Sequence, residues 1–152
     1  MKKRGIYLLP DACYLSELNV PGKPNRTNLG KCAAIQRFLS THPNENLAIL
    51  TPYRNQRALL AGTAKKSSYP QEVSLTVHRA QGREWDTVLF SVVDTTGKFF
   101  TTTLNPQNCG TQIINTAVSR AKNRLILVCD YNDWGDQPKK RIGQLLQVAQ
   151  SI

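Results

Sequence analysis

TVLFSVV, residues Thr87–Val93, is a near-continuous run of apolar and β-branched side chains. Such a run is typical of a strand that is buried on both faces, as the strands of a parallel sheet are. Four further segments are predicted strands: Gly5–Leu9, Leu47–Thr51, Val73–Val77 and Arg124–Asp130.

Four segments between these strands are predicted helices: Gly30–Ser40, Tyr53–Ala64, Thr111–Ala121 and Lys139–Ser151. In three of them the apolar residues fall on one stripe, and Pro52 suits the first turn of the second. Strands that alternate with helices pair in parallel through right-handed crossovers. The sequence therefore predicts an α/β fold of three layers around a mostly parallel sheet.

The chain of 152 residues is predicted to form a single domain over 1–152. Two stretches rich in proline, glycine, asparagine or threonine interrupt the pattern. We expect an irregular N-terminal segment at 1–28 and a loop insertion at 94–110.

The balance of charge is strongly basic, because 20 lysines and arginines face 10 acidic residues, for a net charge of +10. Such a surface attracts polyanions, which favours nucleic acid or phosphate as a partner over a merely soluble basic domain. No apolar run is long enough to span a membrane, and no signal peptide is evident. Four scattered cysteines support neither a zinc site nor a disulfide framework, so we expect no metal site and a reducing, cytoplasmic setting.

Polar side chains follow or precede the predicted strands in three segments: Thr51–Gln56, Thr76–Glu84 and Asn115–Asn123. Ligands bind at the carboxyl ends of the strands in open parallel sheets. We therefore expect the arginines and small hydroxyl residues of these segments to converge on one edge, where they would form a phosphate site.

Three stretches resemble motifs IV, V and VI of superfamily 1 helicases: TPYRNQ from Thr51, TVHRAQGREWDTVLFS from Thr76, and INTAVSRAKNRLILV from Ile114. The nearest resemblance is to the 5′-to-3′ branch, which includes RecD-like and nonsense-mediated-decay-type helicases. The match covers Leu47–Asp130, and NRTNLGKCAAIQRFL upstream weakly resembles the helix that precedes motif IV.

The resemblance implies the second, C-terminal RecA-like domain of a helicase, in which ATP with Mg²⁺ lies between two such domains. Arg120 matches the arginine finger of motif VI. The residues that would contact ATP are Gln81, Gly82, Glu84 and Arg124. The residues that would contact single-stranded DNA or RNA are Thr51, Tyr53, Arg54, Thr76, His78 and Arg79.

Several of these residues also have a structural interpretation, and for Arg120 the alternative is a purely structural role. Tyr53 is alternatively the first core residue of its helix, and His78 a loop histidine that hydrogen-bonds the backbone. Glu84, Arg83 and Arg124 are alternatively partners in surface ion pairs. Trp85 is expected to pack in the core or at a domain interface, and Lys122 to lie in the last turn of its helix, where a cation suits the dipole.

Half of an ATP site is missing from the sequence, which has no G-x-x-x-x-G-K-[ST] motif, no acidic pair after an apolar strand and no QYR-type opening motif. We therefore expect no motor activity from the chain alone. It is either part of a larger helicase or a separate protein that needs a P-loop domain in trans. The alternative function is a non-catalytic nucleic-acid-binding or interaction module.

Overall fold

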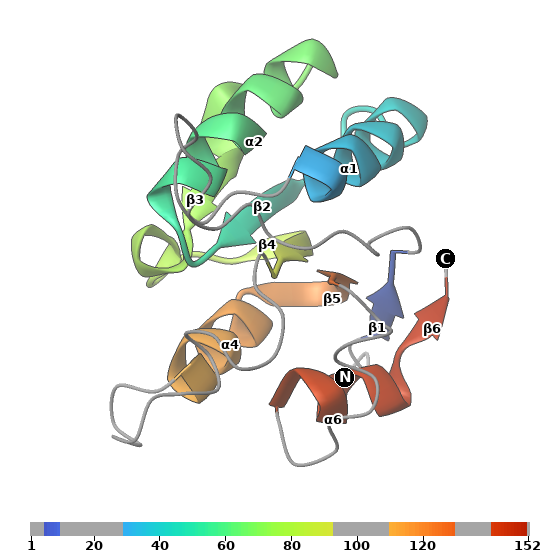
Figure 1. Ribbon diagram of the computed structural model, residues 1–152, viewed down its shortest axis with the longest axis vertical. Coiled ribbons are helices and arrows are strands. Elements are labelled where there is room, and N and C mark those ends of the chain that lie inside the picture. Colours follow the sequence, from blue (N-terminus) through green and yellow to red (C-terminus); the bar gives the residue numbers. More distant parts are fainter. Residues whose placement is uncertain (1–4, 10–28, 93–109, 130–140, 152) are drawn as a thin grey trace.

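The computed structural model describes residues 5–9, 29–92, 110–129 and 141–151 (Figure 1). The strands are β1 (Gly5–Leu8), β2 (Leu47–Thr51), β3 (Ser74–Thr76), β4 (Trp85–Ser91), β5 (Ala121–Val128) and β6 (Gln150–Ser151). The helices are α1 (Leu29–Thr41), α2 (Arg54–Lys66), α4 (Gly110–Ser119) and α6 (Arg141–Val148), with 3₁₀ turns η1 (Gln71–Val73) and η2 (Val77–Ala80).

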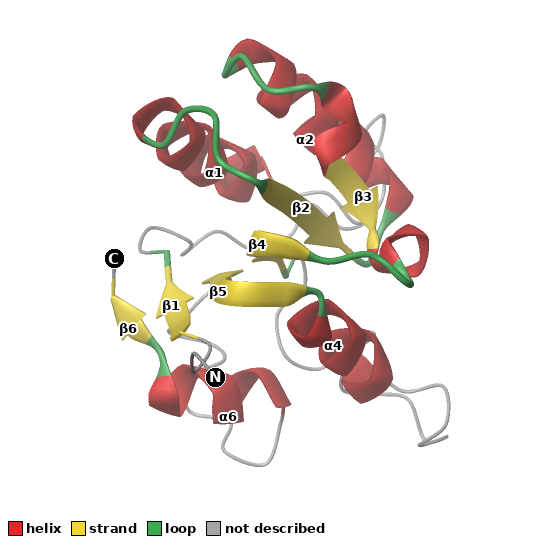
Figure 2. Cartoon of the chain, turned by 180° about the vertical axis from the view of Figure 1, so that it is seen from behind, coloured by secondary structure: helices red, strands yellow, loops and turns green. Residues whose placement is uncertain are grey.

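The described strands form one sheet of six strands in the order β3-β2-β4-β5-β1-β6, and every pairing between them is parallel. Helices α1 and α2 cover one face of the sheet, and α4 and α6 cover the other (Figures 1 and 2). The predicted α/β, three-layer RecA-like fold is confirmed.

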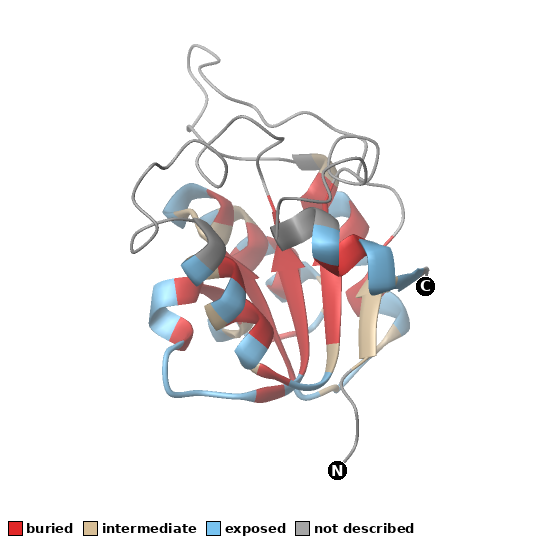
Figure 3. Cartoon of the chain, turned by 90° about the horizontal axis from the view of Figure 1, so that it is seen from below, coloured by how far each residue is buried: buried red, intermediate tan, exposed pale blue. Residues whose placement is uncertain are grey.

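The core has two halves, one on each face of the sheet (Figure 3). Leu125 and Leu127 of β5 face α4 and α6, whereas Ile126 and Val128 face α1 and α2. All four side chains are fully buried. This double burial explains why β4 and β5 carry almost continuous apolar runs.

The boundaries of several elements differ from the prediction. Val77 belongs to η2 because the chain turns away from the sheet after Thr76. Helix α4 ends at Ser119 and β5 begins at Ala121, which pairs with Trp85 of β4. The placement of Lys122 in the last turn of a helix was therefore wrong, since it lies in β5.

The C-terminal helix is also shorter than predicted. It ends at Val148, and Gln150–Ser151 form β6 by pairing with Tyr7 and Leu8 of β1. Within the expected irregular segment, Gly5–Leu8 are a strand, as the apolar run indicated. Leu9, which follows the strand, is buried. Residues 1–4 and 10–28 of that segment and residues 94–109 of the expected insertion lie outside the described residues, while Gly110 already belongs to α4.

A β-bulge interrupts the pairing of β4 with β5. Trp85 lies opposite Ala121 and Thr87 opposite Arg124, so β5 has one residue more than β4 over this interval. Bulges of this kind redirect side chains and are frequent next to functional sites. Here the bulge lies beside Asp86, at the amino-terminal edge of the sheet.

Candidate nucleotide and nucleic-acid sites

The carboxyl-terminal edge of the sheet carries two of the predicted strand-binding threonines. Thr51 and Thr76 end β2 and β3 and lie opposite each other in the parallel pairing. Both side chains are buried. The Thr51 hydroxyl has no hydrogen-bond partner among the described residues.

A basic hollow of about 390 Å³ opens beside these strand ends. The residues that line it are Pro52, Arg54, Arg57, Thr76, His78 and Arg79. Four of the six predicted strand-binding residues are therefore brought together here. No acidic side chain is among the described residues that line the hollow, which concentrates positive charge at this edge.

Arg57 is a lining residue that the sequence interpretation missed. Its Nε donates to the Ser74 carbonyl (3.2 Å), and the Ser74 hydroxyl donates to the Arg57 carbonyl (2.8 Å). Arg57 follows Arg54 by three residues, so both lie on the same face of α2. This helical spacing was the signal that would have found it.

Tyr53 and His78, the two strand-binding candidates for which structural alternatives were given, are both accessible. Tyr53 is the N-cap of α2 and half-buried, so it is not a core residue of that helix. It precedes the hollow without lining it. His78 is exposed on η2, and its imidazole forms no hydrogen bond with the backbone of the described residues.

The predicted nucleotide-binding residues gather at the opposite, amino-terminal edge. Gln81–Glu84 precede β4 and are all exposed, and Arg120 immediately precedes β5. The Trp85 amide donates to the Arg120 carbonyl (2.9 Å). Arg120 Nη1 in turn donates to the Arg83 carbonyl (3.3 Å), which holds the arginine beside the 81–84 turn.

Hydrogen bonds to the preceding residue, Ser119, hold the half-buried Arg120 guanidinium in place. Its Nε and Nη2 both donate to the Ser119 hydroxyl, at 3.2 and 3.0 Å.

Gly82 has a φ of 77°, in the left-handed region, and no atom lies within 4 Å of where a Cβ would be. Its backbone conformation, and not a crowded neighbourhood, therefore favours glycine.

Two neighbours of this turn have structural roles. Trp85 packs in the core, as expected, and the Arg83 guanidinium lies 4.8 Å from the centre of its ring. The expected ion pair of Arg83 is therefore replaced by a cation–π contact. Glu84 forms no ion pair with the described Arg79 or Arg83, which leaves its exposed carboxylate available.

The expectation that all these residues converge on one edge was wrong. In a parallel sheet the residues that follow strands and those that precede strands lie at opposite edges. Thr51 and Thr76 end their strands, whereas Glu84 and Arg120 precede theirs. The segment from η2 to Glu84 joins the two edges and contributes residues to both.

A family model described as an AAA domain matches residues 24–132, well over half of the chain. The chain belongs to this AAA domain family. The family is found in superfamily 1 helicases, so the chain contains a helicase-like, NTPase-type domain. A comparison with curated proteins gave no match.

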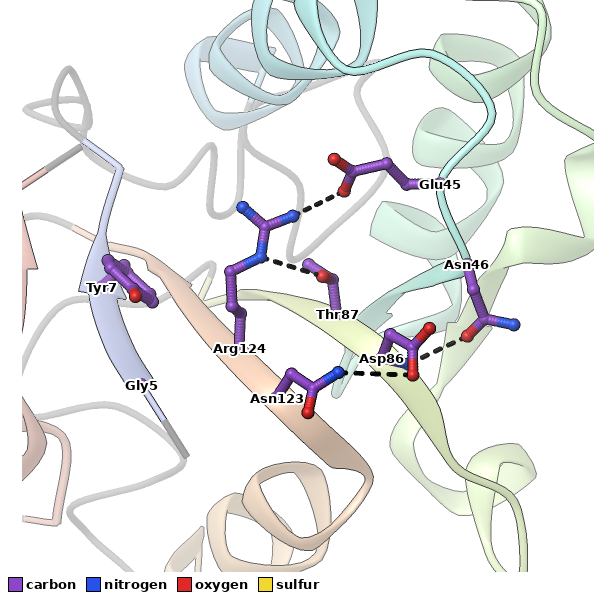
Figure 4. Close-up of a pocket in the computed structure, with 8 residues that line it drawn as sticks. All are labelled: Gly5, Tyr7, Glu45, Asn46, Asp86, Thr87, Asn123 and Arg124. Atoms are coloured by element: carbon purple, nitrogen blue, oxygen red, sulfur yellow. Dashed lines mark hydrogen bonds and ion pairs between the residues drawn. The ribbon is translucent and has the colours of Figure 1, made fainter. Parts of the chain in front are cut away.

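Arg124 lies apart from the other predicted nucleotide-binding residues of this helicase-like domain. Its Nη2 forms an ion pair with Glu45 Oε2 (2.6 Å), and its Nε donates to the Thr87 hydroxyl (3.2 Å). These contacts agree with the ion-pair interpretation of Arg124. They place it in a second cavity at the amino-terminal edge (Figure 4).

Arg120 lies next to the turn that carries the exposed Glu84. An arginine beside an exposed carboxylate suits a phosphate and a sugar hydroxyl. Within the described ranges, no cluster of three histidine, cysteine or acidic side chains is arranged to hold a metal. None of the described helices has the length and apolarity that a membrane span requires.

Proposed function

We propose that this chain is the second RecA-like domain of an ATP-dependent helicase or translocase of the RecD-like, 5′-to-3′ branch. In this proposal Arg120 acts on ATP that a P-loop domain holds, in cis or in trans, and the basic hollow binds a single strand of DNA or RNA. The observation that carries the proposal is the separation of Arg120 and the basic hollow onto opposite edges of one sheet.

At the amino-terminal edge, Arg120 offers a planar guanidinium that is half-buried and already oriented. Such a group can donate to two phosphate oxygens at once and offset the negative charge that develops in transfer. Ser119 and the Arg83 carbonyl restrict the side chain before any ligand arrives. Less conformational entropy is then lost when a phosphate binds.

Glu84 and Gly82 complete this edge in the proposal. The Glu84 carboxylate is exposed and free to accept a hydrogen bond from a sugar hydroxyl. Gln81 lies one residue before Gly82 and would couple nucleotide to strand, because η2 connects it to the basic hollow. Bound ATP with Mg²⁺ supplies the phosphoryl group that is transferred to water.

At the carboxyl-terminal edge, the basic hollow supplies the charge that a phosphate backbone requires. Arg54, Arg57 and Arg79 line it together with His78 and Thr76. Tyr53 is half-buried at the start of α2, and in this proposal its ring stacks on a base outside the hollow.

The test is to replace Arg120 with alanine in the assembled motor, with its P-loop domain present. Strand-stimulated ATP hydrolysis should fall on the order of 10³-fold, as for other arginine fingers. Strand affinity should remain unchanged, because the basic hollow is intact. Lys122→Ala is the matched control, since Lys122 is an exposed cation two residues further along. Unchanged turnover in Arg120→Ala would contradict the proposal.

The absence of a P-loop from the sequence favours a second candidate function, a non-catalytic module that binds nucleic acid. It predicts salt-sensitive strand binding by the chain with no response to ATP at any concentration of a P-loop partner. An ATP-dependent change in strand affinity would exclude it.

A further inference from the structure

The second cavity at the amino-terminal edge has a volume of about 540 Å³. We call it the edge pocket; among the residues that line it are Tyr7, Glu45, Asp86, Thr87, Asn123 and Arg124. Its size is in the range of small-molecule sites. Neither Arg120 nor any residue of the basic hollow lines it, so it requires an explanation of its own.

We propose that the edge pocket binds a guanine base. Guanine offers two N–H donors on one edge, two acceptors on the neighbouring edge and a flat aromatic face. A carboxylate accepts from the first edge, and a guanidinium donates to O6 and N7 on the second. The edge pocket combines a carboxylate, a guanidinium and an aromatic ring (Figure 4).

Arg124 is held in place before any ligand binds. Glu45 and Thr87 engage Nη2 and Nε, while Nη1 makes no hydrogen bond within the described part of the chain. The guanidinium therefore keeps donors available in a fixed orientation. Donors that are held in place discriminate between bases better than mobile donors do, because they cannot move to accommodate a wrong base.

Asp86 supplies the carboxylate from the strand opposite the bulge. Its backbone amide donates to Asn46 Oδ1 (2.9 Å), and its Oδ1 accepts a long bond from Asn123 Nδ2 (3.5 Å). Its other oxygen has no hydrogen-bond partner among the described residues and stays available for the two donors of guanine. The bulge brings both Asn123 and Arg124 to the pocket, although consecutive strand residues normally point to opposite faces.

Tyr7 provides the aromatic surface because Gly5 leaves room for it. A Cβ at position 5 would lie 2.6 to 2.9 Å from atoms of the Tyr7 ring, so only glycine permits this position of the ring. Stacking accepts any base. Selectivity must therefore come from Asp86 and Arg124.

The polar contacts favour guanine over adenine. The side-chain amide of Asn or Gln recognises adenine with two hydrogen bonds: its oxygen accepts from N6, and its nitrogen donates to N7. In the edge pocket, Asn46 already uses its oxygen and Asn123 its nitrogen. No such prior bond occupies the free oxygen of Asp86 or Nη1 of Arg124.

The experiment is calorimetric titration of the full 152-residue chain with the 5′-monophosphates of guanosine, adenosine and uridine, which differ only in the base. The guanine nucleotide should bind at least about tenfold more tightly than the other two. Guanosine without phosphate should keep this preference over adenosine. A guanine-containing tetranucleotide that displaces the mononucleotide would indicate a strand as the source of the base, and failure to displace it a free nucleotide.

Asp86→Asn provides the decisive variant, because Asp86 is exposed and its replacement does not disturb the core. It should lose the preference for guanine and instead favour xanthosine 5′-monophosphate, since xanthine has a carbonyl where guanine has its amino group. Glu72→Gln, which changes an exposed carboxylate on η1, is the matched control and should bind as the wild type does.

The inference is overturned by equal affinity for the guanine and adenine nucleotides, or by unchanged guanine binding in Asp86→Asn. Affinity for the guanine nucleotide weaker than about 1 mM would overturn it as well. These outcomes do not depend on ATP turnover, so they leave the motor proposal to its own test.

Discussion

Removing two arginines from the basic hollow should change how strand binding depends on salt. The variant is Arg54→Ala with Arg79→Ala; Arg57 is kept because it also bonds the Ser74 carbonyl. Each phosphate contact with a single strand contributes about −0.7 to the slope of log affinity against log salt. Three arginines therefore give a slope of about −2.1 and the variant about −0.7.

These slopes give clearly different affinity losses. Between about 50 and 200 mM salt, three contacts lose about 20-fold in affinity and a single contact about threefold. Fluorescence anisotropy of a labelled oligothymidylate, measured over this range, gives both slopes directly. The matched control is Lys65→Ala with Lys66→Ala, which removes the same charge from the far end of α2. Equal slopes in the variant and this control would refute the assignment of the strand to the basic hollow.

Three further predictions concern two single residues and one ion pair, and urea denaturation measures each of them. Thr51→Val should leave stability unchanged or raise it by about 1 kcal/mol, because it replaces a buried hydroxyl that lacks a partner; a large loss of stability would reveal an unseen hydrogen bond. Gly82→Ala should cost roughly 1 kcal/mol, because alanine is strained at a φ of 77°; an unchanged midpoint would contradict this reason. A double-mutant cycle on Glu45→Gln and Arg124→Met should give a coupling of about 0.5–1 kcal/mol, because both side chains are about one-third exposed; a coupling of zero would show that solvent screens the pair.

The strands were predictable to the extent that burial determines their composition. Leu125–Val128 are buried on both faces, so their apolar run was visible without any structure. The first residues of β4 and β5 carry no such apolar pattern, so the sequence did not indicate where these strands begin. Lys122 and Asn123 are polar and exposed, and their strand conformation depends on pairing with β4 across the bulge.

The short C-terminal strand β6 could not be predicted from the sequence for the same reason. Gln150–Ser151 continue a helical pattern and have little strand propensity of their own. They form β6 because the edge of β1 is available for pairing at Tyr7 and Leu8. Such long-range pairing leaves no local signal.

The candidate sites were predictable in their residue types and less so in their geometry. Motif resemblance identified Arg79 and Arg120, and the arrangement of strands then placed them at different edges. The expectation of one edge failed because residues before and after strands were treated alike. Arg57 was missed because the motif ends before it, although its helical spacing from Arg54 was visible.

The most direct test is to map the backbone amide shifts of this chain by NMR in the assembled motor, with its P-loop domain present, in separate titrations with Mg²⁺-ATP and with an oligothymidylate. The oligothymidylate should shift the amides of Arg54–Arg57 and Thr76–Arg79, at the carboxyl-terminal edge. ATP should shift the amides of Gln81–Glu84 and Ser119–Arg120, at the amino-terminal edge. Shifts by both ligands at one edge, or no shift around Arg120 with ATP, would contradict the proposed function.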